Sequence, residues 1–265
     1  MKVVILAGGY GNRLFEETIS KPKPMVEIGG MPILWHIMKI YSAYGFREFI
    51  ICMGYKQEVI IEYFRNNFAY VKEKNKYGGE NNKQTFYNKV DDWKITLVDT
   101  GIETLTGGRV KKISSLIGND TFLLSYGDTL GNINIRETIN FHKENNVIVT
   151  LSAVQPRSNY GVIHFNTNKK TVKNFKEKPI ESNQWINGGF YVVEPEFLNY
   201  IEGDYTSFEL EPFEKIVKQN KLAAYKHNGF WKSIETYKDK LILEDLWSKN
   251  EALWNLGEQN LGKVL

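Results

Sequence analysis

A glycine-rich stretch near the start of the chain constrains the fold more than any other segment. Residues 2–5 (Lys-Val-Val-Ile) are apolar and β-branched apart from the lysine, and they predict the first buried strand of a parallel sheet. Gly8, Gly9 and Gly11 follow, and they permit backbone conformations closed to other residues while exposing N–H groups to an anion. The segment therefore has the character of a phosphate-binding loop.

Two basic residues flank this loop. Arg13 offers a fork of donors for phosphate oxygens, and Lys23 lies between Pro22 and Pro24, which stiffen the backbone on both sides of it. A dinucleotide-binding turn is one alternative, but Leu14 stands where that fingerprint needs a third small residue. A turn without any ligand is the other alternative. The two cations favour a phosphate ester.

Composition excludes several classes of protein. Hydrophobic residues make up 42% of the 265 residues, which is enough for the core of a single globular domain. The net charge of +3 is too small to indicate nucleic acid or an anionic membrane as a partner. The single cysteine, Cys52, excludes an internal disulfide and is expected in a buried strand. The four histidines form no close cluster in the sequence and are interpreted as structural.

No segment indicates export or insertion into a membrane. The first predicted strand begins within two residues of Met1, so we expect no signal peptide. No apolar run approaches the roughly 18 residues that a membrane span requires. A cytoplasmic protein is therefore expected.

Strands and helices are expected to alternate along the chain. Apolar spacing predicts helices at 32–44 and 57–67, on either side of a strand at 49–53. This order predicts an α/β fold with a Rossmann-like doubly wound mixed sheet, whose ligands bind at the carboxyl ends of the strands. Further strands are expected at 95–98, 122–125, 147–154, 160–165, 171–175, 185–193 and 222–226, and further helices at 109–116, 133–144, 209–218 and 237–248.

Residues 69–93 interrupt this pattern with lysine, asparagine, glycine, tyrosine and glutamate. A surface loop is one interpretation of so long an excursion. The other is a hairpin or arm that contacts a neighbouring subunit or closes on a nucleotide.

The motifs resemble those of a known family. Leu6-Ala7-Gly8-Gly9-x-Gly11-x-Arg13-Leu14, followed by Pro22-Lys23-Pro24, resembles the signature of the sugar-phosphate nucleotidyltransferases. The longer match over residues 21–38 resembles the branch that transfers a cytidylyl group to glucose 1-phosphate. The resemblance resumes at 96–101, 106–109, 126–128, 177–179, 186–190 and 229–231, so it spans nearly the whole chain.

The resemblance implies a GT-A-like nucleotidyltransferase fold and an Mg²⁺-dependent reaction. CTP and a hexose 1-phosphate, first of all α-D-glucose 1-phosphate, would give a CDP-sugar and pyrophosphate for deoxysugar and surface polysaccharide synthesis. A homo-oligomer is also implied. The single domain would comprise a nucleotide-binding part (1–130), an acceptor-binding part (131–235) and a C-terminal helical extension (236–265).

The resemblance also implies the residues of the site. Arg13 would meet the outer phosphates of the nucleotide, Lys23 the α-phosphate and Lys178 the acceptor phosphate, and these three are the predicted catalytic residues. The implied nucleotide-binding residues are Leu6, Ala7, Gly8, Gly9, Gly11, Asn12, Arg13, Lys23, Thr106, Gly107, Gly108 and Arg109. The implied acceptor-binding residues are Tyr126, Glu177, Lys178, Asn187 and Gly188.

Two carboxylates are the candidate metal ligands. Asp128 follows the predicted strand at 122–125, at the ligand-binding end of the sheet, although a turn cap is its alternative role. The resembled family places an aspartate before Thr236, where this chain has Glu235. An impaired metal site would make the protein a weak enzyme or a non-catalytic regulatory subunit.

Residues 129–132 also depart from the pattern of the resembled branch, which leaves another sugar phosphate or a phosphorylated alcohol open as the acceptor.

Overall fold

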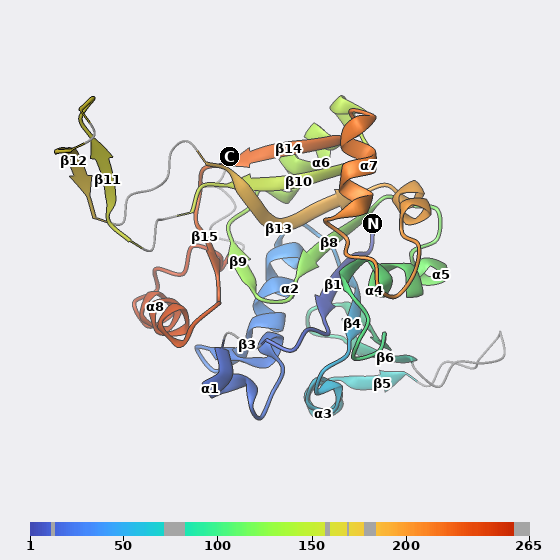
Figure 1. Cartoon of the computed structure of the whole chain (residues 1–265). Helices are drawn as coiled ribbons and strands as arrows, with labels where there is room; N and C mark the ends of the chain where they lie inside the picture. The colour runs from blue at the N-terminus through green and yellow to red at the C-terminus, as the bar shows by residue number, and fades with distance from the viewer. Residues whose placement is uncertain (12–13, 72–82, 157–159, 169, 178–183, 257–265) are drawn as a thin grey trace.

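A mixed sheet lies at the centre of the molecule, shown by the computed structural model in Figure 1. The structure describes residues 1–11, 14–71, 83–156, 160–168, 170–177 and 184–256. Over these residues the sheet has nine strands, in the spatial order β14 (Leu222–His227), β10 (Val149–Val154), β13 (Ile186–Val193), β8 (Phe122–Tyr126), β1 (Val3–Ala7), β4 (Glu48–Met53), β7 (Trp93–Asp99), β6 (Lys83–Asn88) and β5 (Ala69–Val71).

Strand direction decides where a ligand can bind. β1 pairs in parallel with both β4 and β8, and β4 pairs in parallel with β7, so the carboxyl ends of these four strands meet at one edge. β13 runs antiparallel to β8, which brings its amino-terminal end to the same edge. The predicted doubly wound mixed sheet is confirmed.

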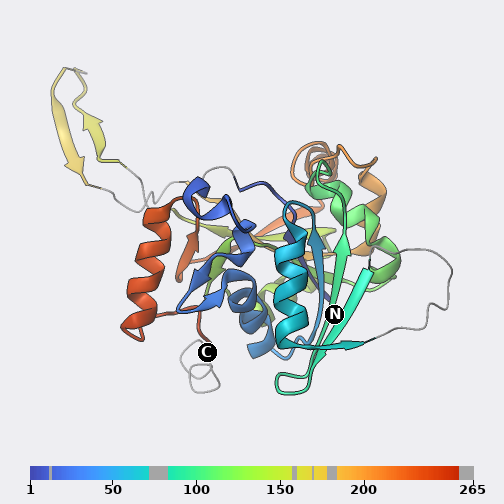
Figure 2. The ribbon, with the colours of Figure 1, turned by 90° about the horizontal axis from the view of Figure 1, so that it is seen from below.

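Helices cover both faces because the side chains of a strand alternate between them. Val3 and Ile5 of β1 pack into one core cluster, whereas Val4 and Leu6 pack into the other. The first cluster includes residues of α2 (Ile33–Ala43), α3 (Gln57–Asn67), α6 (Ile135–Asn145) and α8 (Tyr237–Ser248). The second includes residues of α4 (Thr106–Lys112), α5 (Ser114–Ile117), η3 (Pro195–Tyr200) and α7 (Glu211–Lys218). Figure 2, which views the molecule from below relative to Figure 1, shows α3 in cyan and α8 in red.

The helices match the sequence predictions closely, with one informative difference. The helices predicted at 57–67 and 237–248 have the bounds of α3 and α8, but the helix predicted at 109–116 is divided into α4 and α5. α4 begins three residues earlier and includes Gly107 and Gly108, which are poor helix formers. Tertiary packing stabilises this turn, because the Gly108 amide donates to Thr206 O (3.2 Å) and a Cβ on Gly107 would lie 2.7 Å from Thr206 O. Among the described residues, no helix is long and apolar enough to cross a bilayer.

The segment at 69–93 contains strands. β5 pairs antiparallel with β6, and β6 pairs antiparallel with β7 at the edge of the sheet. The hairpin interpretation is therefore confirmed for the described residues, and the surface-loop interpretation is wrong for them; residues 72–82 lie outside the described part. A role in subunit contact or in closing on a nucleotide stays a prediction.

A second hairpin stands apart from the main sheet. β11 (Val162–Phe165) and β12 (Val172–Lys176) pair with each other as a separate two-stranded sheet. Figures 1 and 2 both show it projecting from the body of the molecule. The two strands were expected from sequence, but they do not join the large sheet.

Several short elements were not expected. β9 (Thr129–Gly131) pairs antiparallel with β15 (Trp231–Ser233), joining segments about 100 residues apart in sequence. The remaining short elements are α1 (Phe15–Thr18), η2 (Lys23–Met25), β2 (Glu27–Ile28) and β3 (Met31–Pro32).

His36 on α2 joins the C-terminal part of the chain to the core. Its ring Nε2 lies 2.9 Å from Ile28 O, and the Trp254 indole donates to Nδ1 (3.4 Å). The Trp247 ring packs edge-on, with its centroid 4.9 Å from that of the imidazole. Burial lowers the pKa of His36 to about 4, so the imidazole is neutral at neutral pH and can accept from Trp254 through Nδ1 while Nε2–H donates.

This buried histidine predicts a pH-dependent stability. The pKa of His36 falls from 6.5 to about 4 on folding, so the unfolded chain binds a proton first as the pH falls. His36 should therefore lower the free energy of unfolding by about 1.4 kcal/mol per pH unit across that interval. Urea unfolding of wild type and His36→Gln at about pH 7 and pH 5 checks this, with the exposed His164→Gln as a matched control. An equal loss of stability in His36→Gln and wild type would contradict it.

Candidate active site

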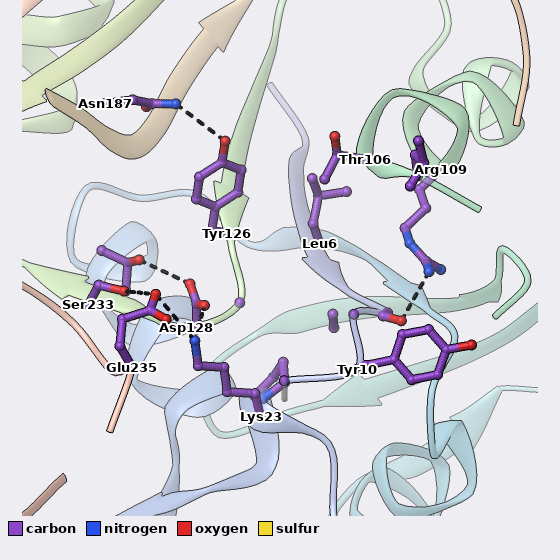
Figure 3. A pocket seen from close by; sticks show the side chains of 18 of the residues that line it. Leu6, Tyr10, Lys23, Thr106, Arg109, Tyr126, Asp128, Asn187, Ser233 and Glu235 are labelled. Atoms are coloured by element: carbon purple, nitrogen blue, oxygen red, sulfur yellow. Dashed lines mark hydrogen bonds and ion pairs between the residues drawn. The ribbon is translucent and has the colours of Figure 1, made fainter. Parts of the chain in front are cut away.

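A pocket of about 830 Å³ lies at the edge of the sheet where the parallel strands end. Its walls come from the glycine loop after β1, the segment after β7, the turn after β8 and the first residues of β13 (Figure 3). The topology accounts for this position, because β1, β7 and β8 end at the edge where β13 begins. The pocket therefore lies where the sequence predicted a ligand site.

Arg109 on α4 anchors one side of the pocket. Its side chain is buried, with 4% of the residue exposed, and its guanidinium donates to atoms at the ends of three strands. The acceptors are Gly8 O (3.0 Å), Met53 O (2.9 Å), Thr100 Oγ1 (2.7 Å), Gly101 O (2.7 Å) and Ile102 O (3.1 Å). Burial lowers the pKa of Arg109, although a guanidinium remains charged in proteins. Arg109 thus holds the glycine loop against the segment that follows β7.

The glycine loop is shaped by this contact. A Cβ on Gly8 would overlap the Arg109 guanidinium, and Gly11 has a φ of +67°, which favours glycine. Gly9 has no atom within 4 Å of a Cβ position, so its backbone remains accessible from the pocket. The predicted residues Leu6, Ala7, Gly8, Gly9 and Gly11 all line the pocket, whereas Asn12 and Arg13 lie outside the described residues.

The two candidate metal ligands meet at one lysine. The ammonium Nζ of Lys23 lies 2.7 Å from Asp128 Oδ2 and 3.4 Å from Glu235 Oε1 (Figure 3). The pairing of β9 with β15 explains this meeting, because Thr129 lies opposite Ser233 in the ladder. The Ser233 hydroxyl also donates to Glu235 Oε1 (2.9 Å). A basic and two acidic side chains from distant parts of the sequence therefore share one wall of the pocket.

The start of α8 fixes the position of Glu235. Thr236 is the N-cap of α8, and its hydroxyl and the Asp239 carboxylate form a capping box. The Glu235 amide donates to Asp239 Oδ2 (3.1 Å). The spacing of Thr236 and Asp239 is a helix-start signal that is visible in the sequence.

The donor set suits a hard divalent cation. Asp128 and Glu235 supply carboxylate oxygens, and Mg²⁺ commonly binds one or two carboxylates and completes its shell with substrate phosphates and water. Among the described residues, no group of three or more histidine, cysteine, aspartate or glutamate side chains could hold a metal. The pair is therefore compatible with a metal that also binds the substrate.

Part of the predicted acceptor side lies in the same pocket. Tyr126 at the end of β8 and Asn187 and Gly188 at the start of β13 line it. Gly188 is constrained by packing, because a Cβ there would lie 2.8 Å from Ser152 O. Trp231 belongs to the motif at 229–231 but was not among the predicted site residues. Its indole donates to Gly188 O (2.8 Å), and it lines the pocket as well.

The other predicted residues lie elsewhere. Glu177 is exposed, follows β12 directly and is not among the pocket-lining residues, and Lys178 lies outside the described residues. Thr106 lines the pocket, but Gly107 and Gly108 do not; they pack against the segment at 204–208. The structure thus brings most of the described candidates together and leaves Glu177, Gly107 and Gly108 outside the pocket.

Tyr10 is a pocket residue that the sequence reasoning did not identify. Its hydroxyl donates to Glu103, which raises the pKa of Tyr10, and its ring centroid lies 5.3 Å from that of Tyr55. Both Tyr10 and Glu103 line the pocket. The hydrogen bond joins the glycine loop to the segment after β7.

Comparison with known proteins agrees with this geometry. The sequence model of the nucleotidyl transferase family matches residues 2–243. The chain belongs to the nucleotidyl transferase family. The resemblance seen in the motifs is therefore confirmed over nearly the full length of this nucleotidyl transferase.

Relatives and solved structures refine the comparison. The glucose-1-phosphate cytidylyltransferase of Salmonella typhimurium is 46% identical over 259 residues, which cover 97% of this chain and 100% of that protein. A mannose-1-phosphate guanyltransferase of Yarrowia lipolytica is 30% identical over 267 residues, covering 96% of this chain and 67% of that protein. The crystal structure of HddC from Yersinia pseudotuberculosis shares the fold, with a TM-score of 0.68, 23% identity and coverage of 93% and 99%.

Proposed function

We propose that this nucleotidyl transferase is a cytidylyltransferase that makes a CDP-sugar and pyrophosphate from CTP and a hexose 1-phosphate. The proposed acceptor is α-D-glucose 1-phosphate. The observation that carries this proposal is the 46% identity to a glucose-1-phosphate cytidylyltransferase over the whole of that protein. A pocket with a glycine loop, a lysine and two carboxylates supports the same chemistry.

The reaction makes mainly electrostatic demands on the protein. The acceptor phosphate is already ionised, so its oxygen can attack the α-phosphorus in line without a general base, and pyrophosphate leaves. The site must orient both substrates and stabilise their negative charge. Lys23 is our candidate for the α-phosphate, Arg13 for the outer phosphates and Lys178 for the acceptor phosphate.

The proposed cofactor is Mg²⁺, held by Asp128 and Glu235. When bound, the ion would neutralise phosphate oxygens and help to orient them. Lys23 contacts both carboxylates, so its positive charge lies beside the proposed metal ligands and close to the glycine loop that is proposed to hold the phosphates.

Shortening Glu235 tests its role as a ligand. Glu235→Asp should withdraw the carboxylate by about one bond length, and Mg²⁺ tolerates little distortion from octahedral geometry. We therefore expect the Mg²⁺ concentration for half-maximal rate to rise at least about threefold. Mg²⁺ titrations of pyrophosphate release measure it, with Glu251→Asp, an exposed residue beyond α8, as the matched control. An unchanged Mg²⁺ requirement in Glu235→Asp would show that Glu235 is not a ligand.

A substrate screen tests the function as a whole. The four nucleoside triphosphates should be combined with a panel of sugar phosphates and phosphorylated alcohols in the presence of Mg²⁺, and pyrophosphate release measured. CTP with glucose 1-phosphate should give the highest rate. A faster rate with another acceptor would mean that the natural acceptor is not glucose 1-phosphate, while the proposed cytidylyl transfer would stand. Nucleotide binding without turnover would support a regulatory subunit instead.

We further propose that the reaction takes place in the cytoplasm, where CTP is available. The product would supply deoxysugar synthesis for a surface polysaccharide, and the enzyme would act as a homo-oligomer without a nucleic acid or membrane partner.

A further inference from the structure

Glu209 lies in the loop before α7 and binds two walls of the pocket. One carboxylate oxygen, Oε1, accepts from the Tyr126 hydroxyl. The other, Oε2, accepts from Thr106 Oγ1 (3.0 Å) and from Ser207 Oγ (2.9 Å). Glu209 is not among the residues that line the pocket, whereas Tyr126 and Thr106 both are.

The carboxylate sets the direction of a hydrogen-bond chain. An ionised carboxylate can only accept, so the Tyr126 hydroxyl donates its hydrogen bond to Glu209 and accepts from its other neighbours. Those neighbours are the Tyr191 hydroxyl (2.6 Å) and Asn187 Nδ2 (3.3 Å). Burial, with added effects of Tyr191 and Glu209, raises the pKa of Tyr126, so this hydroxyl keeps its proton.

The chain ends by orienting Asn187. The amide nitrogen donates to the hydroxyls of Tyr126 and Tyr191, and Oδ1 accepts from the Gly189 amide (3.0 Å). Figure 3 shows the Asn187 nitrogen directed toward Tyr126. An amide oxygen has two lone pairs, so Oδ1 can accept one further hydrogen bond from a sugar hydroxyl.

We propose that Glu209 is a positioning residue that orders the acceptor wall of the pocket through Tyr126 and ties it to the nucleotide wall at Thr106. This inference rests on the proposed function of the pocket. Thr106 has a second anchor, because its Oγ1 accepts from the Phe208 amide (2.8 Å). Loss of the Glu209 charge should therefore disturb acceptor binding more than CTP binding.

Glu209→Gln removes the charge and adds a donor, so the direction of the chain is no longer fixed. We expect the KM for the sugar 1-phosphate to rise about tenfold, as for a lost hydrogen bond to a charged group, and the KM for CTP to change less than about twofold. Glu211→Gln, at an exposed residue in the first turn of α7, is the matched control and should leave both values unchanged. Equal changes in both KM values would indicate a purely structural role and overturn the proposal.

A double variant tests whether Glu209 acts through Tyr126. Tyr126→Phe alone should raise the KM for the sugar 1-phosphate, and adding Glu209→Gln should cause little further loss. Additive losses would overturn the proposal. If Glu209→Gln does not fold, Glu209→Asp provides the same comparison, because it keeps the charge but withdraws it from Tyr126.

A wild-type protein without turnover would refute the proposed function, whereas an active wild type with an unaltered Glu209→Gln variant would refute only this inference.

Discussion

Replacing Asp128 with asparagine should lower kcat by about a thousandfold or more, the scale of losing one major charge-stabilising group in an active site. The substitution keeps the size of the side chain and removes its charge. Asp128 Oδ2 also pairs with Lys23 at 2.7 Å, so the variant loses the proposed metal ligand and one of the two carboxylates that pair with Lys23. Pyrophosphate release from CTP and glucose 1-phosphate at saturating Mg²⁺ measures the effect.

The control for this variant is Asp120→Asn. Asp120 is exposed in the turn before β8. Asp120→Asn therefore removes the same charge from a nearby part of the chain, at a residue that does not line the pocket. Asp120→Asn should keep wild-type kcat, and a thermal melt of both variants should confirm that the fold is intact. Retained activity in Asp128→Asn would mean that the metal site has been placed wrongly.

Replacing Arg109 with methionine should have the largest effect on stability. Five acceptors at the ends of β1, β4 and β7 would each lose one donor, and four of them are backbone carbonyls. Gly8 O would keep the Tyr55 amide as a donor, and Met53 O would keep the amide and hydroxyl of Thr100, so the loss falls mainly on the other three acceptors. Buried polar atoms without partners cost about 1–3 kcal/mol each, although relaxation and water lower the total. We expect a loss of about 3–5 kcal/mol in the free energy of unfolding and at least a tenfold rise in the KM for CTP.

Urea unfolding and CTP kinetics measure these two effects. Arg136→Met on the exposed face of α6 is the matched control, because it removes the same charge and adds the same apolar group at the surface. Arg136→Met should change the free energy of unfolding by less than about 0.5 kcal/mol. A loss of under about 1 kcal/mol in Arg109→Met would contradict the structural role given to Arg109.

The sequence predicts the elements of this fold better than it predicts their contacts. Helices α3 and α8 follow from the apolar residues within them, and the capping residues at the start of α8 are a further sequence signal that the prediction did not use. The β9–β15 ladder is different, because strands of three residues have too little periodicity to predict. That ladder is nevertheless what brings Asp128 and Glu235 to the same lysine.

The predicted site residues show the same limit. Arg109 was expected at the nucleotide because of its place in a motif, but the motif does not reveal that its guanidinium supports the glycine loop. Glu209 belongs to none of the segments that carry the resemblance, and only the three-dimensional contacts show that it joins Thr106 to Tyr126. Glu177 was expected at the acceptor, yet it follows an exposed hairpin strand outside the pocket.

The most direct test of the proposed reaction follows the fate of labelled phosphates. The protein should be incubated with Mg²⁺, glucose 1-phosphate and CTP labelled at either the α- or the γ-phosphate. We predict that the α-label appears in CDP-glucose and the γ-label in pyrophosphate, and that neither product forms without the sugar phosphate. Release of CMP or inorganic phosphate instead, or no product at all, would contradict cytidylyl transfer to a sugar phosphate.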